Sequence, residues 1–397
     1  MKNRNFALLL VVTFLAYACV PSPPGPGFPI PTYGPTSLKL TATLSPFETA
    51  KFTPFPTLTE TFTPSPTFTE TSTSTETATS TSTETSTPTA TFTASPPPNA
   101  ITIPGLSDWD AGSLAFSHGS EGEWDFFLWG GFANSLIKKG DTYYLYYQGS
   151  PSYDNQCDSV AQRSIGVATS TDGIQWVKSA NNPVITWSGQ GSIEEGAASS
   201  AAWLGADGKI YIYYGANTGS GCIVNANARL AVSEDGVNFQ DVGEVLSGSD
   251  PTVWGSGDEI FPVGIYSHEN QWYLYYVPNG VSLSRKLGVA IGVSPIVFTQ
   301  SMGVNDSTIP AWGPVSIILE GLDSVLITNP NDGSGSINIY RFSANNPALV
   351  QFQDSYALSN CNQASVLYES IESGHHWMIS CRDQNADNYY IRNAFTP

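Results

Sequence analysis

The second half of the chain repeats one pattern of apolar and polar positions. A run of aromatic residues occurs three times, at residues 143–147 (YYLYY), 211–214 (YIYY) and 272–276 (WYLYY). Each run is followed by a variable loop, an arginine and a run of small and β-branched residues, which in the first two copies ends at Asp172-Gly173 and Asp235-Gly236. Aromatic and β-branched residues favour strands, and Asp-Gly favours tight hairpin turns. The pattern predicts antiparallel strands and no long helix.

The copies recur at intervals of about 50 to 70 residues, which is typical of a β-propeller with one sheet per repeat. They begin near Trp124, Ile193 and Asp258, and two weaker copies follow at 315–342 and 364–395. The sequence therefore predicts an all-β, five-bladed β-propeller. The last copy has three clear strands, so residues 112–117 are expected to add the fourth strand and close the ring. Closure removes open sheet edges, which favours a monomer.

The chain divides into three parts, and the first is predicted to be a secretory signal at residues 1–19. Lys2 and Arg4 precede an apolar run at 6–16 that is too short to span a bilayer comfortably. The segment 15–19 (LAYAC) resembles the lipobox of bacterial lipoproteins, which implies that Cys19 is lipidated and that the protein is extracellular and held at the cell surface. Ordinary cleavage near Ala18 is the alternative.

Residues 20–100 consist mostly of Thr, Ser and Pro. This composition buries too little apolar surface to fold, and proline favours extended chain, so a disordered stalk is expected. Residues 101–397 are long enough for the propeller domain. The whole chain carries 34 acidic residues against 15 Lys and Arg, a formal net charge of −19. Such a surface disfavours nucleic acids and anionic lipids but is compatible with neutral polysaccharides. Membrane contact is thus expected only through the lipid.

Four cysteines follow Cys19, and an even number in an exported domain indicates disulfides. Cys157 and Cys222 fall at matching places in successive repeats, and Cys361 and Cys381 flank a hairpin. We predict these two pairs. There is no Cys-x-x-Cys motif and the histidines are scattered, so no metal and no cofactor is expected.

The strand at 143–147, the segment 166–176 (GVATSTDGIQW) and the segment 182–185 (NPVI) together resemble the five-bladed propellers of glycoside hydrolase families 32 and 43 and their relatives. The resemblance covers most of residues 120–300. It implies hydrolysis of glycosidic bonds in a polysaccharide or oligosaccharide. It also implies that the first strands of blades one, two and three each bring an acid to the central cavity, as general base, pKa modulator and general acid.

Carboxylates do occur at these three places: Asp125, then Glu194 and Glu195, then Asp258 and Glu259. The resemblance assigns Asp125 as base, Glu195 as modulator and Glu259 as acid. The chain departs from the family where the base normally lies in an Asp-Pro step, because Ala133-Asn134 stand there. Asp108 or Asp110 could replace that base from another loop. The chemistry is therefore either rearranged or lost.

Several other residues are candidates for binding the sugar. Trp129, Trp254 and Trp312 lie in loops that lead into blades and could stack on sugar rings, or could simply be packed in the core. Arg163 and Arg285 could orient substrate, although with Arg229 they recur at similar places in three repeats, which also fits a structural ion pair. The leading hypothesis is a surface glycosidase-like propeller. A non-catalytic carbohydrate-binding propeller and a purely structural or adhesive surface protein are the alternatives.

Overall fold

The computed structural model describes residues 101–151, 163–186, 196–218, 225–257, 259–279, 286–305, 307–311, 313–320, 323–330, 335–359, 361–383 and 387–397. The segments predicted at residues 1–19 and 20–100, Cys19, and the predicted pair Cys157–Cys222 lie outside these residues. Among the described residues, no helix has the length and apolar character needed to cross a bilayer.

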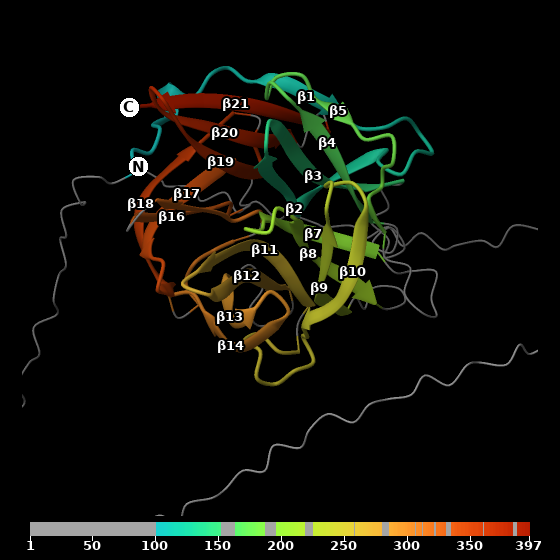
Figure 1. Cartoon of the computed structure of the whole chain (residues 1–397), viewed down its shortest axis with the longest axis vertical. Helices are drawn as coiled ribbons and strands as arrows, with labels where there is room; N and C mark the ends of the chain where they lie inside the picture. Colours follow the sequence, from blue (N-terminus) through green and yellow to red (C-terminus); the bar gives the residue numbers. More distant parts are fainter. Residues whose placement is uncertain are drawn as a thin grey trace, which may run out of the picture. The chain divides into compact units, whose positions relative to one another are not determined.

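The described residues form five antiparallel sheets arranged as the blades of a propeller (Figure 1). Blade one contains β2 (Phe127–Lys139), β3 (Thr142–Ser150), β4 (Ser164–Ser170) and β5 (Val177–Lys178), with β6 (Ile185–Thr186) pairing β4. Blade two contains β7 (Gly196–Leu204), β8 (Ile210–Thr218), β9 (Asn225–Ser233) and β10 (Phe239–Leu246). Blade three contains β11 (Glu259–His268), β12 (Gln271–Asn279), β13 (Gly288–Ser294) and β14 (Val297–Gly303). The predicted all-β propeller is confirmed.

The two weaker repeats are complete blades. Blade four contains β15 (Ser316–Glu320), β16 (Asp323–Thr328), β17 (Ser336–Ser343) and β18 (Asn346–Ala357). Blade five contains β19 (Ala364–Ile371), β20 (Gly374–Asp383), β21 (Asn388–Thr396) and, as its outermost strand, β1 (Ser113–Ser117). The expectation that residues 112–117 complete the last blade is thus confirmed. The start of the domain closes the ring by pairing with its end.

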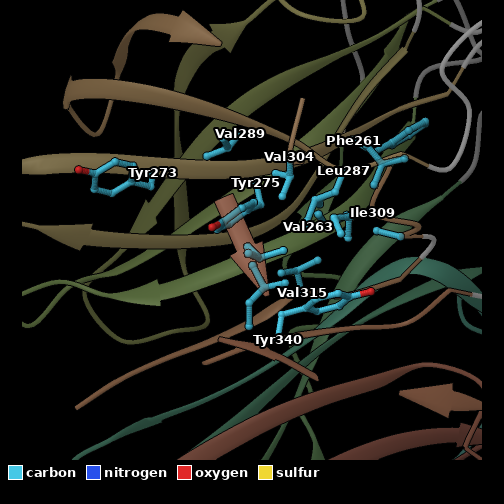
Figure 2. Close-up of a cluster of buried hydrophobic side chains, with 14 of the residues drawn as sticks. Phe261, Val263, Tyr273, Tyr275, Leu287, Val289, Val304, Ile309, Val315 and Tyr340 are labelled. Carbon is cyan, nitrogen blue, oxygen red and sulfur yellow. The ribbon is translucent and has the colours of Figure 1, made fainter. Parts of the chain in front are cut away.

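The aromatic strands are the second strands of their blades, and both of their faces are buried between neighbouring sheets. Tyr146 and Tyr147, adjacent in β3, are both 0 % exposed. Tyr146 packs toward Phe239 of blade two, whereas Tyr147 packs toward Tyr389 of blade five. Between blades three and four the same arrangement forms a cluster that includes Tyr275 (Figure 2). Covering on both faces explains why these strands lack polar alternation.

The Asp-Gly pairs form the turns before the outermost strands of blades one and two, as predicted. The carboxylate of Asp172 accepts hydrogen bonds from the backbone N–H groups of Ile174 and Gln175, each at 2.8 Å. Gly173 and Gly236 have φ angles of 72° and 83°, in the left-handed region that glycine tolerates best.

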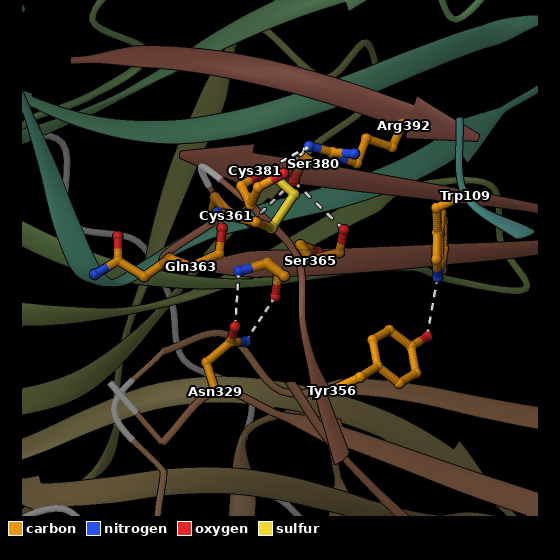
Figure 3. Close-up of a disulfide and its surroundings, with 12 residues drawn as sticks. Trp109, Asn329, Tyr356, Cys361, Gln363, Ser365, Ser380, Cys381 and Arg392 are labelled. Carbon is orange, nitrogen blue, oxygen red and sulfur yellow. Dashed lines mark hydrogen bonds between the residues drawn. A yellow bond between two sulfur atoms is a disulfide. The ribbon is translucent and has the colours of Figure 1, made fainter. Parts of the chain in front are cut away.

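The predicted pair Cys361–Cys381 is a disulfide, buried beside the β19–β20 hairpin (Figure 3). Ala364, the first residue of β19, pairs with Cys381, so the bond ties the hairpin to the segment that leads into it. Trp109 lies in the same cluster and donates from Nε1 to Tyr356 Oη at 2.9 Å. The disulfide thus joins the core that holds the start of the domain against blades four and five.

Loss of this disulfide should lower the stability of the domain. The two cysteines are 20 residues apart in sequence, and closing a loop of that length stabilises a folded protein by about 3 kcal/mol. The double variant Cys361→Ala, Cys381→Ala should therefore melt about 5 °C below the wild type in calorimetry. A wild-type melting temperature in the double variant would contradict this expectation.

Candidate functional site

The innermost strands of the five blades, β2, β7, β11, β15 and β19, line a central cavity of about 230 Å³. The described residues that line it are mostly small or aliphatic, and none of them is a carboxylate. Serine hydroxyls tie these strands together: Ser365 Oγ accepts from Leu136 N at 3.0 Å, and Ser316 Oγ accepts from Val366 N at 2.7 Å. The hydroxyl groups of the cavity wall are therefore used in bonds between strands. A carboxylate that acts on a molecule in the cavity has to lie at an opening of it.

At the end of the cavity where the innermost strands begin, neutral amides are buried (Figure 3). Asn329 donates to Ala364 O at 2.8 Å and accepts from Ala364 N at 3.0 Å. Asn134 donates to Gln363 O at 3.4 Å and accepts from Ser380 Oγ at 3.1 Å. Asn134 is the residue that stands where the family resemblance expects a base. A buried amide held in this way cannot accept a proton as a carboxylate does.

Glu259 is the first residue of β11, and its side chain is partly exposed at the same end of the propeller. Asn279, its partner across the hairpin, donates from Nδ2 to Glu259 Oε2 at 2.6 Å. Arg163, just before β4, is partly buried. Burial lowers the pKa of Arg163 to about 10, while the negative charge of Glu259 acts in the opposite direction. The two side chains therefore attract each other across blades one and three.

The backbone of blade two also reaches the region around Arg163 and Glu259, which we call the junction. Ala197 N, near the start of β7, donates to Arg163 O at 2.8 Å. The junction therefore joins the first strands of blades two and three to the third strand of blade one. It is the point at which these elements could present polar groups to a bound molecule. Among the described residues, no group of three His, Cys, Asp or Glu side chains has the arrangement of a metal site.

Asp125 lies elsewhere. It is 3 % exposed, and its carboxylate pairs with Lys178 of the outermost strand β5 at 2.6 Å. Tyr147 Oη donates to the same oxygen at 3.1 Å. Tyr147 belongs to the cluster packed against blade five. Side chains alternate between the two faces of a strand, and Ile165 and Val167 of β4 face blade two. Arg163 continues this alternation on the face turned toward blade two. The structure thus separates Asp125 from Glu259 by the thickness of the blade-one sheet.

Trp254 supports its own blade. Its ring lies against Gly288 and is 6.2 Å from the ring of Tyr276, in an edge-on contact. Tyr276 Oη also donates to Trp254 O at 2.8 Å. Packing in the core, the alternative to sugar binding for this residue, therefore explains the contacts on one side of the ring.

Arg229 differs from the other two arginines. It pairs with Asp241 of β10. Arg229 is in register with Tyr214, whereas the corresponding tyrosines of blades one and three are in register with Gly166 and Gly288. Arg163 and Arg285 stand three residues before those glycines in the sequence. Only Arg163 and Arg285 therefore occupy matching positions in their repeats, and the expected equivalence of all three arginines is wrong for Arg229.

The remaining predicted site residues are not placed by the structure. Trp129 is in β2, opposite Gln148, but its side chain lies outside the described residues. The others that lie outside the described residues are Glu194, Glu195, Asp258, Arg285 and Trp312. Asn279 was missed by the sequence analysis. Its signal was its position at the end of the hairpin that starts at Glu259, because the two ends of a hairpin face each other.

Comparison with known proteins places the fold but not the family. No protein-family model matches the chain, and no curated protein matches it. A family 117 glycoside hydrolase from the marine bacterium Zobellia galactanivorans is similar in structure, with a TM-score of 0.52 and 15 % identity over 72 % of this chain and 90 % of that one. An N-acetylgalactosamine deacetylase from F. plautii, solved with blood group B trisaccharide, has a TM-score of 0.50 and 14 % identity over 72 % of this chain and 96 % of that one. The expected likeness in fold to glycoside hydrolase propellers is therefore confirmed.

Proposed function

We propose that the propeller binds carbohydrate where its innermost strands begin and hydrolyses glycosidic bonds there. The observation that carries the proposal is the position of Glu259. It opens the innermost strand of blade three, is partly exposed, accepts a hydrogen bond from Asn279, and is attracted by the positive charge of Arg163. A carboxylate held in one orientation at the mouth of a cavity is suited to act on a bound sugar.

Hydrolysis of a glycosidic bond uses two carboxyl groups, one protonated and one ionised. In our proposal the second carboxyl group is that of Glu195. It is not that of Asp125, because the Asp125 carboxylate forms an ion pair with Lys178. Glu195 precedes Gly196, the first residue of β7, and the next residue bonds to Arg163 O. We choose Glu195 because it directly precedes, in the sequence, the residues of β7 that reach the segment of Arg163.

The positive charge of Arg163 helps to assign which of the two carboxyl groups is ionised and which is protonated. A cation beside a carboxylate favours the charged form of that carboxylate. We therefore assign Glu259 the ionised role, as base or nucleophile, and Glu195 the role of proton donor. This reverses the role that the family resemblance implies for Glu259. Arg163 would position Glu259 and contact the sugar.

A hydrolysis screen tests the proposal. The purified exported protein is incubated with neutral polysaccharides and with oligosaccharides prepared from them, and the release of reducing ends is measured. The proposal predicts saturable hydrolysis of at least one glycan. The proposal fails if every glycan that binds the protein remains intact after long incubation.

One observation favours a second candidate, a non-catalytic carbohydrate-binding propeller. Asn134 holds the place where the family resemblance expects a base, and it is 1 % exposed and hydrogen bonded on both sides of its amide. A binding protein needs hydrogen-bonding groups and aromatic surfaces but no paired carboxylates. Binding of glycans without turnover in the screen would support this candidate.

We also propose that a lipid on Cys19 holds the protein at the outer cell surface, with residues 20–100 as a stalk. Cys19→Ser removes the thiol that would be acylated, so this variant should move from the membrane fraction to the medium. Immunoblotting of the two fractions measures the change. Because Cys19 is far in sequence from residues 101–397, the melting temperature of the propeller should stay the same. Retention of Cys19→Ser in membranes would contradict the anchor.

A further inference from the structure

A groove of about 550 Å³ lies on the outer rim, between blades three and four. Its walls include Ser301 and Met302 of β14, Leu349 and Asn346 of β18, and Trp254. We call it the rim groove. It shares no lining residue with the central cavity. The rim groove is therefore a separate feature from the site proposed above.

Trp254 is held in place on one side of the groove. The backbone N–H of Trp254 donates to Ser301 Oγ at 2.6 Å. Its six-membered ring lies across Gly288 and Gly303, which are paired between β13 and β14. A Cβ added at these glycines would come within 2.5 Å and 2.9 Å of indole carbons. Only glycines let the ring approach so closely, and the ring position is fixed before any ligand binds.

The opposite wall is also preformed. Asn305 N donates to Ala348 O at 2.8 Å. The side chain of Asn305 donates to Val350 O at 2.7 Å and accepts from Val350 N at 2.9 Å. These bonds tie the loop after β14 to β18, on either side of Leu349. The Leu349 side chain, which is 59 % exposed, therefore stands on a rigid support.

The chemistry of the groove is that of a neutral sugar site. The described lining residues carry no formal charge, although the whole chain has a net charge of −19. They offer an indole, an aliphatic side chain, serine hydroxyls and an asparagine amide. Apolar C–H faces of sugar rings pack on indole and aliphatic groups, while sugar hydroxyls bond to hydroxyls and amides.

Blade one offers an informative contrast. Trp124 lies over Gly166 as Trp254 lies over Gly288, so the two tryptophans occupy matching places in the repeat. The pocket beside Trp124, however, is lined by Glu123, Asp125 and Lys178. Its charged groups bond to one another or to the backbone. The tryptophan over a glycine is therefore a repeated structural feature, and the uncharged surroundings distinguish the rim groove from the pocket in blade one.

We propose that the rim groove is a second carbohydrate-binding site, which holds a neutral polysaccharide while the central site acts on the same polymer. This proposal rests on the proposed function in one respect, namely that the polymer bound in the groove is the one hydrolysed at the central site. Two sites on one domain raise the effective concentration of the chain at each of them. The groove would thus contribute to retention on long polymers and not to turnover of short substrates.

Leu349→Asp tests the groove, because Leu349 is exposed and its replacement should leave the fold intact. The exported protein is run in native gels that contain xylan, arabinan or mixed-linkage glucan, and the hydrolysis of a short oligosaccharide from the same polymer is measured. Leu349→Asp should weaken binding of the polymer about tenfold and leave the oligosaccharide rate unchanged. Asn346→Ala should act in the same direction. Val177→Asp, at a residue 68 % exposed in blade one, is the matched control and should bind as the wild type does.

Each outcome decides between explanations. Wild-type retention in both groove variants would overturn the proposal. Loss of oligosaccharide hydrolysis in a folded Leu349→Asp protein would also overturn it, because the groove would then be part of the central site. A wild-type dimer that Leu349→Asp dissociates in sedimentation would identify the groove as a contact between two copies. Groove-dependent binding without any hydrolysis would support the groove and reject the proposed hydrolase.

Discussion

Replacing Glu259 with Gln should lower the rate of glycan hydrolysis at least about 100-fold. The amide keeps the shape of the side chain but neither ionises nor acts as a general acid or base near neutral pH. Arg163 would lose the charge beside it, so some loss of stability is expected too. Rates should therefore be measured well below the melting temperature. The initial rate of reducing-end release, compared with the wild type, is the measurement.

Two companion measurements separate the roles of Glu259. Glu259→Asp keeps the charge beside Arg163 but withdraws the carboxylate by one methylene, so it should stay folded and still lose most activity. Substrates with a good leaving group, such as dinitrophenyl glycosides, need no proton donor. Because we assign Glu259 the ionised role, Glu259→Gln should be impaired on these substrates as well. Near-normal rates on them would make Glu259 the proton donor instead, and near-normal rates on all substrates would remove it from the mechanism.

Asp125→Ala should destabilise the fold by about 2 kcal/mol, because it removes the buried carboxylate of an ion pair whose lysine is partly exposed. Lys178 would lose its partner at 2.6 Å, and Tyr147 would lose the acceptor of its hydroxyl group. The midpoint and slope of urea unfolding give the change in free energy. Activity on a short substrate, measured on the folded fraction, should change little because Asp125 lies on the far face of the blade-one sheet.

A matched control uses an ion pair of the same type on the surface. Glu234 pairs with Lys209, and their side chains are 77 % and 40 % exposed. Glu234→Ala should leave the midpoint of urea unfolding nearly unchanged, because solvent screens an exposed ion pair. Should Asp125→Asn instead abolish hydrolysis while leaving the unfolding midpoint unchanged, Asp125 would be the catalytic base and our account of the site would be wrong.

Much of the fold was predictable because each repeat carries its own local signals. The aromatic runs mark strands buried on both faces, and Asp172-Gly173 marks a turn that few other sequences can make. The closing strand was predictable by counting, since the last repeat lacked one strand and residues 112–117 could supply it. The Cys361–Cys381 pair followed from its position across one hairpin. Except for the closing strand, which joins the two ends of the domain, these are relations between residues within one repeat.

The candidate site depended on relations that the sequence does not contain. Asp125 and Glu259 precede their aromatic strands by similar numbers of residues, yet only Glu259 opens an innermost strand. Asp125 belongs to a loop that folds against the blade-five side, where Lys178 provides a partner. Similar spacing could not distinguish these two outcomes, because the face on which a loop packs is set by partners from other strands.

The sequence by itself determined the repeat, the strands and turns within each blade, and the positions that could carry acids. The tertiary structure alone decided which charged groups influence one another, as it did for Arg163 of blade one and Glu259 of blade three. Strand alternation is local, so a sequence can specify it. Which polar side chains meet depends on how the blades twist and pack around a common axis, and this brings together residues that are about 100 positions apart.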